Sequence, residues 1–186
     1  MDRRIKYTKL RLKKSIVELL RDYPIEKITV KQLCETADIN RSTFYAHYSD
    51  PFDLLQQLEQ EVIDQLMEHI SQSIFVEESE NIRNVLDIML KYIQQNADLF
   101  KVLLSENGDM AFQKDMMRIT QQKTITDLQN NKNLDPDIFS YVQSFEISGA
   151  LSIVQKWLKN GMVESTQKMS KLLMTLLYQG LSGMTS

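Results

Sequence analysis

Residues 28–55 of the chain read ITVKQLCETADINRSTFYAHYSDPFDLL, and the pattern of this stretch indicates how the N-terminal part folds. Thr29 is a good helix N-cap residue. After it, apolar side chains recur at i, i+3, i+4 and i+7, a spacing that predicts a short helix with one buried face: Val30, Leu33, Cys34 and Ala37. Asp38 and Ile39 then predict a tight break, because aspartate tolerates the left-handed conformation better than most residues.

A second short helix, of about eight residues, is expected after this break. Asn40 is its N-cap, and Phe44 and Tyr48 share a face that we expect to be buried. The outward side then carries hydroxyls, a phenol, a cation and a small residue, contributed by Arg41, Ser42, Thr43, Tyr45, Ala46 and His47. Such groups can bond phosphates and base edges. The pattern is typical of a helix-turn-helix, whose second helix lies in the DNA major groove.

The same stretch resembles the signature of the TetR/AcrR family of transcription regulators. The positions that match the hallmark residues of that family are Thr43, Phe44, Tyr45, His47, Tyr48, Leu54 and Leu55. The resemblance implies that bases are contacted by Lys31, Arg41, Ser42 and Thr43. It implies that phosphates are positioned mostly by Thr29, Tyr45 and His47.

Two positions depart from the family pattern. Asp38 stands in the turn where the family usually has glycine, and Pro51 stands at the start of the fourth helix where it usually has lysine. The second change removes a cation that could contact a phosphate. Lys6, Lys9 or Lys14 could compensate for its loss.

The rest of the chain also predicts helices. Apolar periodicity indicates a first helix over residues 6–22, stopped by Pro24, and a fourth that opens at Asp50-Pro51 and continues to about Ile74. Further helices are expected after the acidic loop at 77–80, the Asn107-Gly108 turn with its Asp109 cap, and the polar turn at 130–134. The first of these helices covers residues 81–96, and the second begins at the Asp109 cap. The third runs from Asp135-Pro136 to Asn160-Gly161, and a last helix covers residues 165–180.

The predicted fold class is therefore all-α, with about nine helices and no strand. Residues 1–50 would form a three-helix, helix-turn-helix DNA-binding head, and residues 51–186 a helical effector-binding and dimerisation body. Charge follows this division: residues 1–50 hold 11 Lys and Arg against 7 Asp and Glu, whereas residues 51–186 hold 11 against 18. A basic head on an acidic body can dock on a polyanion while the body stays in solvent.

The composition favours a cytoplasmic protein. The chain has one cysteine, Cys34, no apolar run long enough to span a membrane, and no apolar stretch behind the charged residues at its start. Cys34 lies on an apolar stripe without a nearby base in sequence, a pattern that argues against a nucleophilic role. The sequence shows no Gly-rich phosphate loop, no metal-ligand spacing and no nucleophile-base pattern, so we expect no enzyme, no cofactor and no metal.

The body resembles one C-terminal class of TetR regulators in its segments 100–116 and 147–165. The last two helices are the expected homodimer seam, through Val154, Trp157, Leu158, Leu172, Leu173 and Leu176. An adaptable effector pocket is expected among soft and aromatic residues: Met89, Phe100, Phe112, Met116, Met117, Tyr141 and Phe145. Taken singly, each pocket position is more typical of plain core than of a ligand contact, and some of the seam positions must pack inside the monomer. The sequence identifies no ligand.

These observations predict a homodimeric, sequence-specific regulator that binds a double-stranded DNA operator. We expect a repressor that a small-molecule effector releases from its operator. The effector would move the fourth helix and so change the spacing between the two helices, one in each subunit, that read the DNA. The alternative is a TetR-like adaptor or activator that acts mainly through a protein partner. The acidic body and Pro51 keep that alternative open, and it predicts weak DNA binding.

Overall fold

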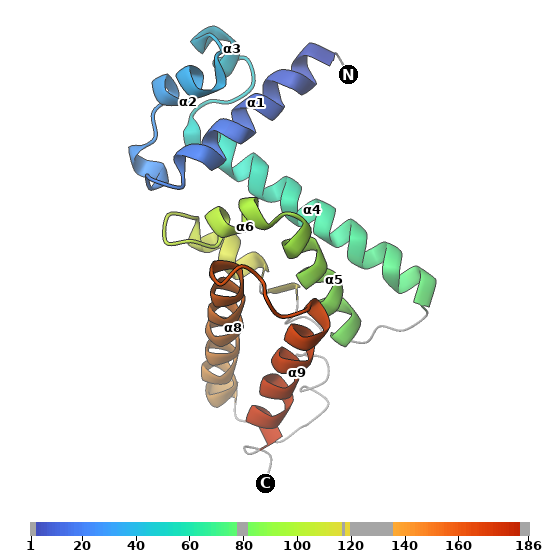
Figure 1. The fold of residues 1–186 in the computed structure, drawn as a ribbon. Coiled ribbons are helices and arrows are strands. Elements are labelled where there is room, and N and C mark those ends of the chain that lie inside the picture. The colour runs from blue at the N-terminus through green and yellow to red at the C-terminus, as the bar shows by residue number, and fades with distance from the viewer. Residues whose placement is uncertain (1–2, 78–81, 117, 120–135, 183–186) are drawn as a thin grey trace. The chain divides into compact units, whose positions relative to one another are not determined.

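The computed structural model describes residues 3–77, 82–116, 118–119 and 136–182, and every regular element in these ranges is a helix (Figure 1). In chain order the elements are α1 (Arg3–Leu19), the 3-10 helix η1 (Ile25–Lys27), α2 (Val30–Ala37), α3 (Arg41–Tyr45), α4 (Pro51–Glu77), α5 (Ile82–Gln95), α6 (Ala97–Leu103), α8 (Pro136–Lys159) and α9 (Thr166–Ser182). Residues 110–116 are also helical. The predicted all-α class is confirmed.

The first helix differs from its predicted range of 6–22. It begins at Arg3 and ends at Leu19. Beyond it the chain makes tight single turns, in which the amides of Arg21 and Asp22 bond carbonyls three residues back at 3.2 Å. The apolar pattern continues through such turns, so periodicity alone overestimates how far a helix extends. Residues 78–80 of the acidic loop, Asp135 and the turn at 130–134 lie outside the described residues.

The chain divides into two compact units. The first comprises Met1–Gln65 and Asp98–Phe112, and the second Leu66–Ala97 and Gln113–Ser186. The first unit therefore contains the three-helix head, the start of α4 and most of α6. The functional boundary expected at residue 50 stays a prediction, because compactness and function need not divide the chain at the same place.

In the first unit, α1 packs against α2 and α2 packs against α3. The side chains of its core are almost fully buried: Leu12, Ile16, Leu20, Leu33, Phe44, Tyr48, Leu54, Phe100, Leu103 and Phe112. Each such side chain stabilises the folded state by roughly 1.5–3 kcal/mol relative to an exposed one. The head therefore has a hydrophobic core, and α3 is attached to it.

The turn predicted at Asn107-Gly108 also belongs to this unit. The Asn107 Nδ2 donates a hydrogen bond to the carbonyl of Leu20, just beyond α1, at 3.1 Å. A Cβ on Gly108 would lie 2.1 Å from the carbonyl oxygen of Leu103, so only glycine fits without a shift of the backbone. The Asp109 carboxylate accepts a hydrogen bond from the amide two residues on at 2.8 Å, which confirms the predicted cap.

In the second unit, α5 packs against α9. The core includes Leu90, Ile93, Val154, Trp157, Leu158, Met169 and Leu173. Trp157 donates its ring N–H to the carbonyl of Glu164 at 2.9 Å, so its polar atom is satisfied within the unit. Gly161 has φ 79, the left-handed conformation predicted for the end of α8.

One carboxyl group is buried in the apolar face of α4. Glu59 is 6% exposed, and its Oε1 has no hydrogen-bond partner among the described residues. It lies one turn from Leu55 and Val62, both of which are also buried. Burial raises the pKa of the Glu59 carboxyl to about 8, and the Asp109 carboxylate adds to the rise. The neutral form of Glu59 is therefore the form that suits the fold.

This burial makes stability depend on pH. A carboxyl whose pKa is higher in the folded than in the unfolded chain contributes full stability below its unfolded pKa and loses it as pH rises toward the folded pKa. The window therefore runs from about pH 4.5 to pH 8. Glu59→Gln keeps the shape without the charge. The free energy of unfolding of Glu59→Gln, compared with that of the wild type, should rise by on the order of 2 kcal/mol as the pH is raised from 5.5 to 8.5. Denaturant unfolding at the two pH values measures this difference.

Glu61→Gln is the matched control, because Glu61 lies on the same helix, is partly exposed and forms an ion pair with Lys13. Its loss is expected to lower stability modestly at both pH values. Wild type and Glu59→Gln curves that run parallel from pH 5.5 to 8.5 would show that Glu59 titrates normally.

Candidate nucleic-acid interface

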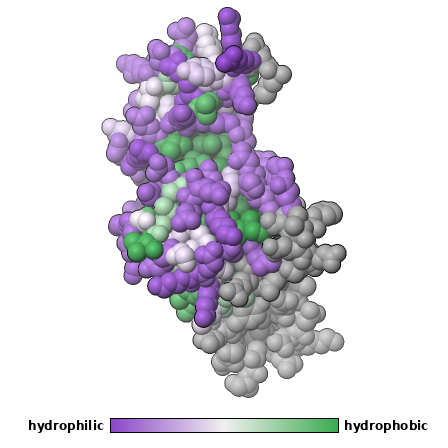
Figure 2. Space-filling view, turned by 45° about the vertical axis from the view of Figure 1, so that its right-hand side comes forward, coloured by the Kyte–Doolittle hydropathy of each residue, from purple (hydrophilic) through white to green (hydrophobic). Residues whose placement is uncertain are grey.

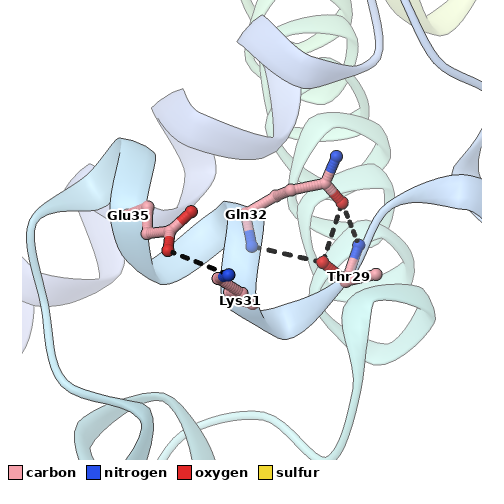
Figure 3. Close-up of polar contacts among 4 residues, drawn as sticks. All are labelled: Thr29, Lys31, Gln32 and Glu35. Atoms are coloured by element: carbon pink, nitrogen blue, oxygen red, sulfur yellow. Dashed lines mark hydrogen bonds and ion pairs between the residues drawn. The ribbon is translucent and has the colours of Figure 1, made fainter.

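The start of α2 is held by a reciprocal cap, drawn in Figure 3. The Gln32 amide donates to the Thr29 hydroxyl oxygen at 3.2 Å, and the Thr29 amide donates to Gln32 Oε1 at 2.9 Å. The Thr29 hydroxyl itself donates to Gln32 Oε1 at 2.8 Å. The predicted cap is confirmed. The Thr29 hydroxyl is thus engaged inside the protein, and the phosphate contact expected of it stays a prediction.

Lys31 stands in the first turn of α2 with an exposed side chain. Its Nζ lies 3.8 Å from the Glu35 carboxylate, one turn further along the helix, as Figure 3 shows. Both side chains are mostly exposed. An exposed pair at this separation is weak, so the ammonium can exchange the carboxylate for a phosphate or a base at little cost.

The break between α2 and α3 is a left-handed turn at Asp38. This residue has φ 50 and ψ 56, and the Ile39 amide bonds the Cys34 carbonyl at 3.0 Å. The prediction that aspartate can replace the usual glycine here is confirmed for the backbone. Asn40 follows in the extended conformation as N-cap of α3, although its side chain makes no capping hydrogen bond.

The helix α3 has five residues rather than the eight or so expected. The chain tightens after it, where the amides of His47 and Tyr48 both bond the carbonyl of Phe44, at 2.9 and 3.0 Å. Because the first of these bonds spans only three residues, the regular helix ends although the polypeptide keeps turning in the same sense.

The two faces of α3 are as predicted. Phe44 is fully buried and Tyr48 is 2% exposed, with ring centroids 5.9 Å apart. On the other side, Arg41, Ser42, Tyr45 and Ala46 are exposed, and Thr43 and His47 are half-buried. The predicted reading residues of this helix thus share one accessible surface, with Tyr45 packed edge-on against Phe44 at 5.6 Å between centroids.

Cys34 lies behind this surface. Its side chain is buried, and burial raises the pKa of the thiol, although the nearby Arg41 charge opposes the rise. A thiol must ionise to act as a nucleophile or to bind a metal. The structure therefore gives Cys34 a packing role, in keeping with the sequence interpretation.

Acidic side chains cap the chain around Pro51, the position where the family usually has a lysine. The Asp50 carboxylate accepts a hydrogen bond from the Asp53 amide at 2.9 Å, and the Asp53 carboxylate accepts one from the Ser49 amide at 2.8 Å. The latter bond, with that from Gln57, lowers the pKa of Asp53. Pro51 is buried. This end of the head therefore presents the carboxylates of Asp50 and Asp53 rather than a cation.

The cations of α1 differ in their surroundings. Arg3, Lys6 and Lys14 are exposed, whereas Lys13 pairs with Glu61. The Lys9 ammonium lies 5.8 Å from the centre of the Tyr48 ring. Arg11 pairs with Asp38, a contact that no sequence motif indicated.

Comparison with known proteins identifies the family. Residues 80–179, more than half of the chain, match the TetR family model for the transcriptional regulator C-terminal region. The chain belongs to the TetR family of transcriptional regulators. The match lies outside the head, so it is independent of the helix-turn-helix signature. The expected family resemblance is confirmed.

Individual proteins similar to this TetR-family chain are themselves transcriptional regulators. It is 22% identical over 178 residues to YxbF, an HTH-type transcriptional regulator of Bacillus subtilis, and it spans 44% of the length of that relative. A TetR transcriptional regulator from Streptococcus agalactiae is similar with a TM-score of 0.69 and 23% identity over 95% of this chain and 96% of that one. FadR from Bacillus subtilis, in complex with stearoyl-CoA, is similar with a TM-score of 0.60 and 16% identity over 90% and 96%. At these identities the two solved structures show the shared fold alone.

The expected dimer residues of this TetR-family body fall into two groups. Val154, Trp157, Leu158 and Leu173 are buried within the second unit, whereas Leu172 and Leu176 are exposed. The buried group packs inside one chain, as was expected for some positions of these stripes. Figure 2 shows that hydrophobic side chains reach one face of the described surface in separate patches among hydrophilic ones.

The expected pocket residues are not all brought together. Phe100 and Phe112 are buried in the first unit with centroids 6.5 Å apart, while Met89 and Met116 are buried in the second. Tyr141 and Phe145 are 73% and 77% exposed on α8, so they lie on the surface of the single chain rather than inside a pocket. Their spacing is that of a helix face, and periodicity cannot tell a face turned inward from one turned outward. Met117 lies outside the described residues.

Within the described residues, no group of three or more His, Cys, Asp or Glu side chains could hold a metal ion. Nor does any helix in this described part of the chain have the length and apolar character needed to cross a membrane.

Removal of the α2 cap tests how far it supports the interface. Thr29→Ala loses the side chain that accepts from the Gln32 amide, and we expect it to lower the free energy of unfolding by about 1 kcal/mol. Thr29→Ser keeps the hydroxyl and should stay within a few tenths of the wild type. Thermal unfolding of the three proteins measures the difference. Equal midpoints for Thr29→Ala and wild type would refute the structural role of the cap.

Proposed function

We propose that the chain is a sequence-specific DNA-binding regulator that acts as a homodimer and represses transcription until an effector releases it. The observation that carries this proposal is the accessible face of α3. Arg41, Ser42, Tyr45 and Ala46 are exposed, while Phe44 and Tyr48 tie the opposite side to the core. A helix held in this way can enter a major groove with its polar side chains leading.

The side chains on this face have complementary tasks in the proposal. Arg41 can bond the O6 and N7 acceptors of a guanine with two parallel hydrogen bonds. Ser42 and Thr43 can bond base edges or phosphates, and Ala46 leaves room for a thymine methyl. Lys31 would add a further base contact. The register of the helix on the duplex would be fixed by phosphate contacts from Thr29, Tyr45 and His47.

Dimerisation through the last two helices is supported by exposed apolar faces. On α8, Ile138, Tyr141 and Phe145 share one face at i, i+3 and i+7 and are exposed, and on α9 Leu172 and Leu176 follow at i, i+4. A second copy of the chain is the occupant that a regulator with paired half-sites requires. We therefore propose that these five side chains, rather than the buried Val154, Trp157, Leu158 and Leu173, meet the partner subunit.

The effector is proposed on more general grounds. Met89 and Met116 give the second unit soft apolar side chains that can adapt to a ligand. The similar FadR structure holds stearoyl-CoA, which supports a small molecule with an apolar part as the class to screen first. To shift the population between bound and released states, such a molecule must bind one state more tightly than the other.

DNA binding is tested by fluorescence anisotropy on the intergenic duplex beside the protein's own gene, with a scrambled duplex for comparison and a salt series. We expect tighter binding to the native duplex, weakened by raised salt as phosphate contacts are lost. Arg41→Ala should weaken native binding by roughly 10- to 100-fold and reduce the preference for that duplex. Arg118→Ala removes an exposed cation of the second unit and should change neither.

Two other results would separate the alternatives. Equally weak, salt-sensitive binding to both duplexes would place the operator elsewhere, and selection from a random pool would then supply it. A confirmed dimer that binds neither duplex at low salt, and enriches no sequence from the pool, would favour the adaptor or activator that works through a protein partner.

The dimer surface is tested separately. Phe145→Glu places a charge on the exposed apolar face of α8, and we expect it to raise the dimer dissociation constant at least about tenfold in sedimentation equilibrium. Val163→Glu, at another exposed apolar side chain, is the matched control and should leave the dimer intact. Phe145→Glu that remains fully dimeric at the wild-type concentration range would exclude this face.

A further inference from the structure

Asp38 places a negative charge at the turn that precedes the reading helix. The residue is three positions before Arg41, and its side chain is 89% exposed. DNA is a dense line of negative charge, and charges within about 10 Å of one another interact appreciably at ordinary salt. An unpaired carboxylate at this turn would therefore oppose the approach of α3 to the groove.

The structure supplies Asp38 with a counter-charge from a distant part of the sequence. The guanidinium of Arg11, on α1, donates a hydrogen bond to the Asp38 carboxylate at 3.1 Å. The contact joins residues 27 positions apart and links the middle of α1 to the turn between α2 and α3. The side chain of Arg11 is only 32% exposed, so its orientation is more restricted than that of Asp38.

A second contact holds Arg11 in place. Its guanidinium carbon lies 5.8 Å from the centre of the Tyr7 ring, one turn earlier on α1. This distance permits a cation-π attraction. The guanidinium thus has two partners within the protein, an aromatic ring on its own helix and a carboxylate at the turn. A phosphate would have to compete with both partners for the guanidinium.

We propose that Arg11 is a positioning residue for α3: it neutralises Asp38 and anchors the turn to α1, and it makes no DNA contact of its own. The proposal rests on the DNA binding proposed above. It also explains how aspartate can occupy a turn where its charge would otherwise repel the ligand. The charge at 38 and the charge at 11 should therefore act on DNA affinity as a coupled pair, not as two independent terms.

The test is a double-mutant cycle of Arg11→Gln and Asp38→Asn, measured by anisotropy on the duplex that the wild type prefers, across a salt series. Asparagine tolerates the left-handed conformation, so Asp38→Asn removes the charge and spares the turn. We expect Arg11→Gln alone to weaken binding by roughly threefold to fivefold at low salt. In the Asp38→Asn background the same change should have a clearly smaller effect, because the ion pair that anchors the turn is already lost and only the general attraction of the Arg11 charge to DNA remains.

Salt dependence separates positioning from contact. Loss of one phosphate contact lowers the slope of log affinity against log salt by about 0.9. Arg11→Gln in the Asp38→Asn background should leave that slope unchanged. Lys14→Gln, which removes an exposed cation one turn further along α1, is the matched control, and its effect should be the same with Asp38 or Asn at position 38. Circular dichroism of each variant confirms that the helices are retained.

Each contrary result has a definite meaning. If Arg11→Gln weakens binding equally in both backgrounds and lowers the slope by about one, Arg11 contacts DNA directly and the positioning role is wrong. If it changes nothing in either background, the ion pair has no bearing on binding, and the inference also fails. If the wild type itself binds no duplex, the proposed function fails first, and this result is distinguishable because no variant need be made.

Discussion

A helix of five residues has too few internal hydrogen bonds to persist alone in water, so α3 depends on the burial of Phe44 and Tyr48. These two rings attach it to a core that α1 and α2 complete. Because both rings are on one side, their burial also determines which side faces outward. The position of Arg41, Ser42 and Tyr45 on the surface is thus a consequence of packing rather than of any preference of their own.

The turns around α3 complete this arrangement. The reciprocal cap at Thr29 defines where α2 starts, and the left-handed Asp38 defines where it ends. Between them they leave α2 eight residues long, which sets where α3 can begin. Small changes in either cap would therefore be transmitted to α3 without any contact with its reading side chains.

Much of this head could be predicted from the sequence, for a physical reason. Caps, turns and the i, i+4 pairing of Phe44 and Tyr48 are local features, and each is recorded in adjacent residues. The Arg11–Asp38 pair is not local, because it joins residues 27 apart and either partner alone reads as a solvated charge. Helix ends were less predictable, since apolar spacing continues into the turns after Leu19 and Tyr45.

The body shows where pattern reasoning stops. Trp157 and Leu172 lie on apolar stripes of similar appearance, yet one is buried in the chain and the other is exposed. Periodicity identifies a stripe but not what covers it. Glu59 is the opposite case: its position one turn from Leu55 and Val62 places it on the stripe of α4, and that spacing was a usable signal that its charge would be buried.

The burial of Cys34 has a practical consequence for anyone who studies this molecule with spectroscopic probes. It is the single cysteine of the chain, it is buried, and burial raises the pKa of its thiol. Maleimide and methanethiosulfonate reagents attack the accessible thiolate, so the native side chain should remain unmodified in the folded state. A cysteine introduced at an exposed site can then carry a fluorophore or spin label in an otherwise wild-type background, without a preliminary substitution that would disturb the core beneath α3.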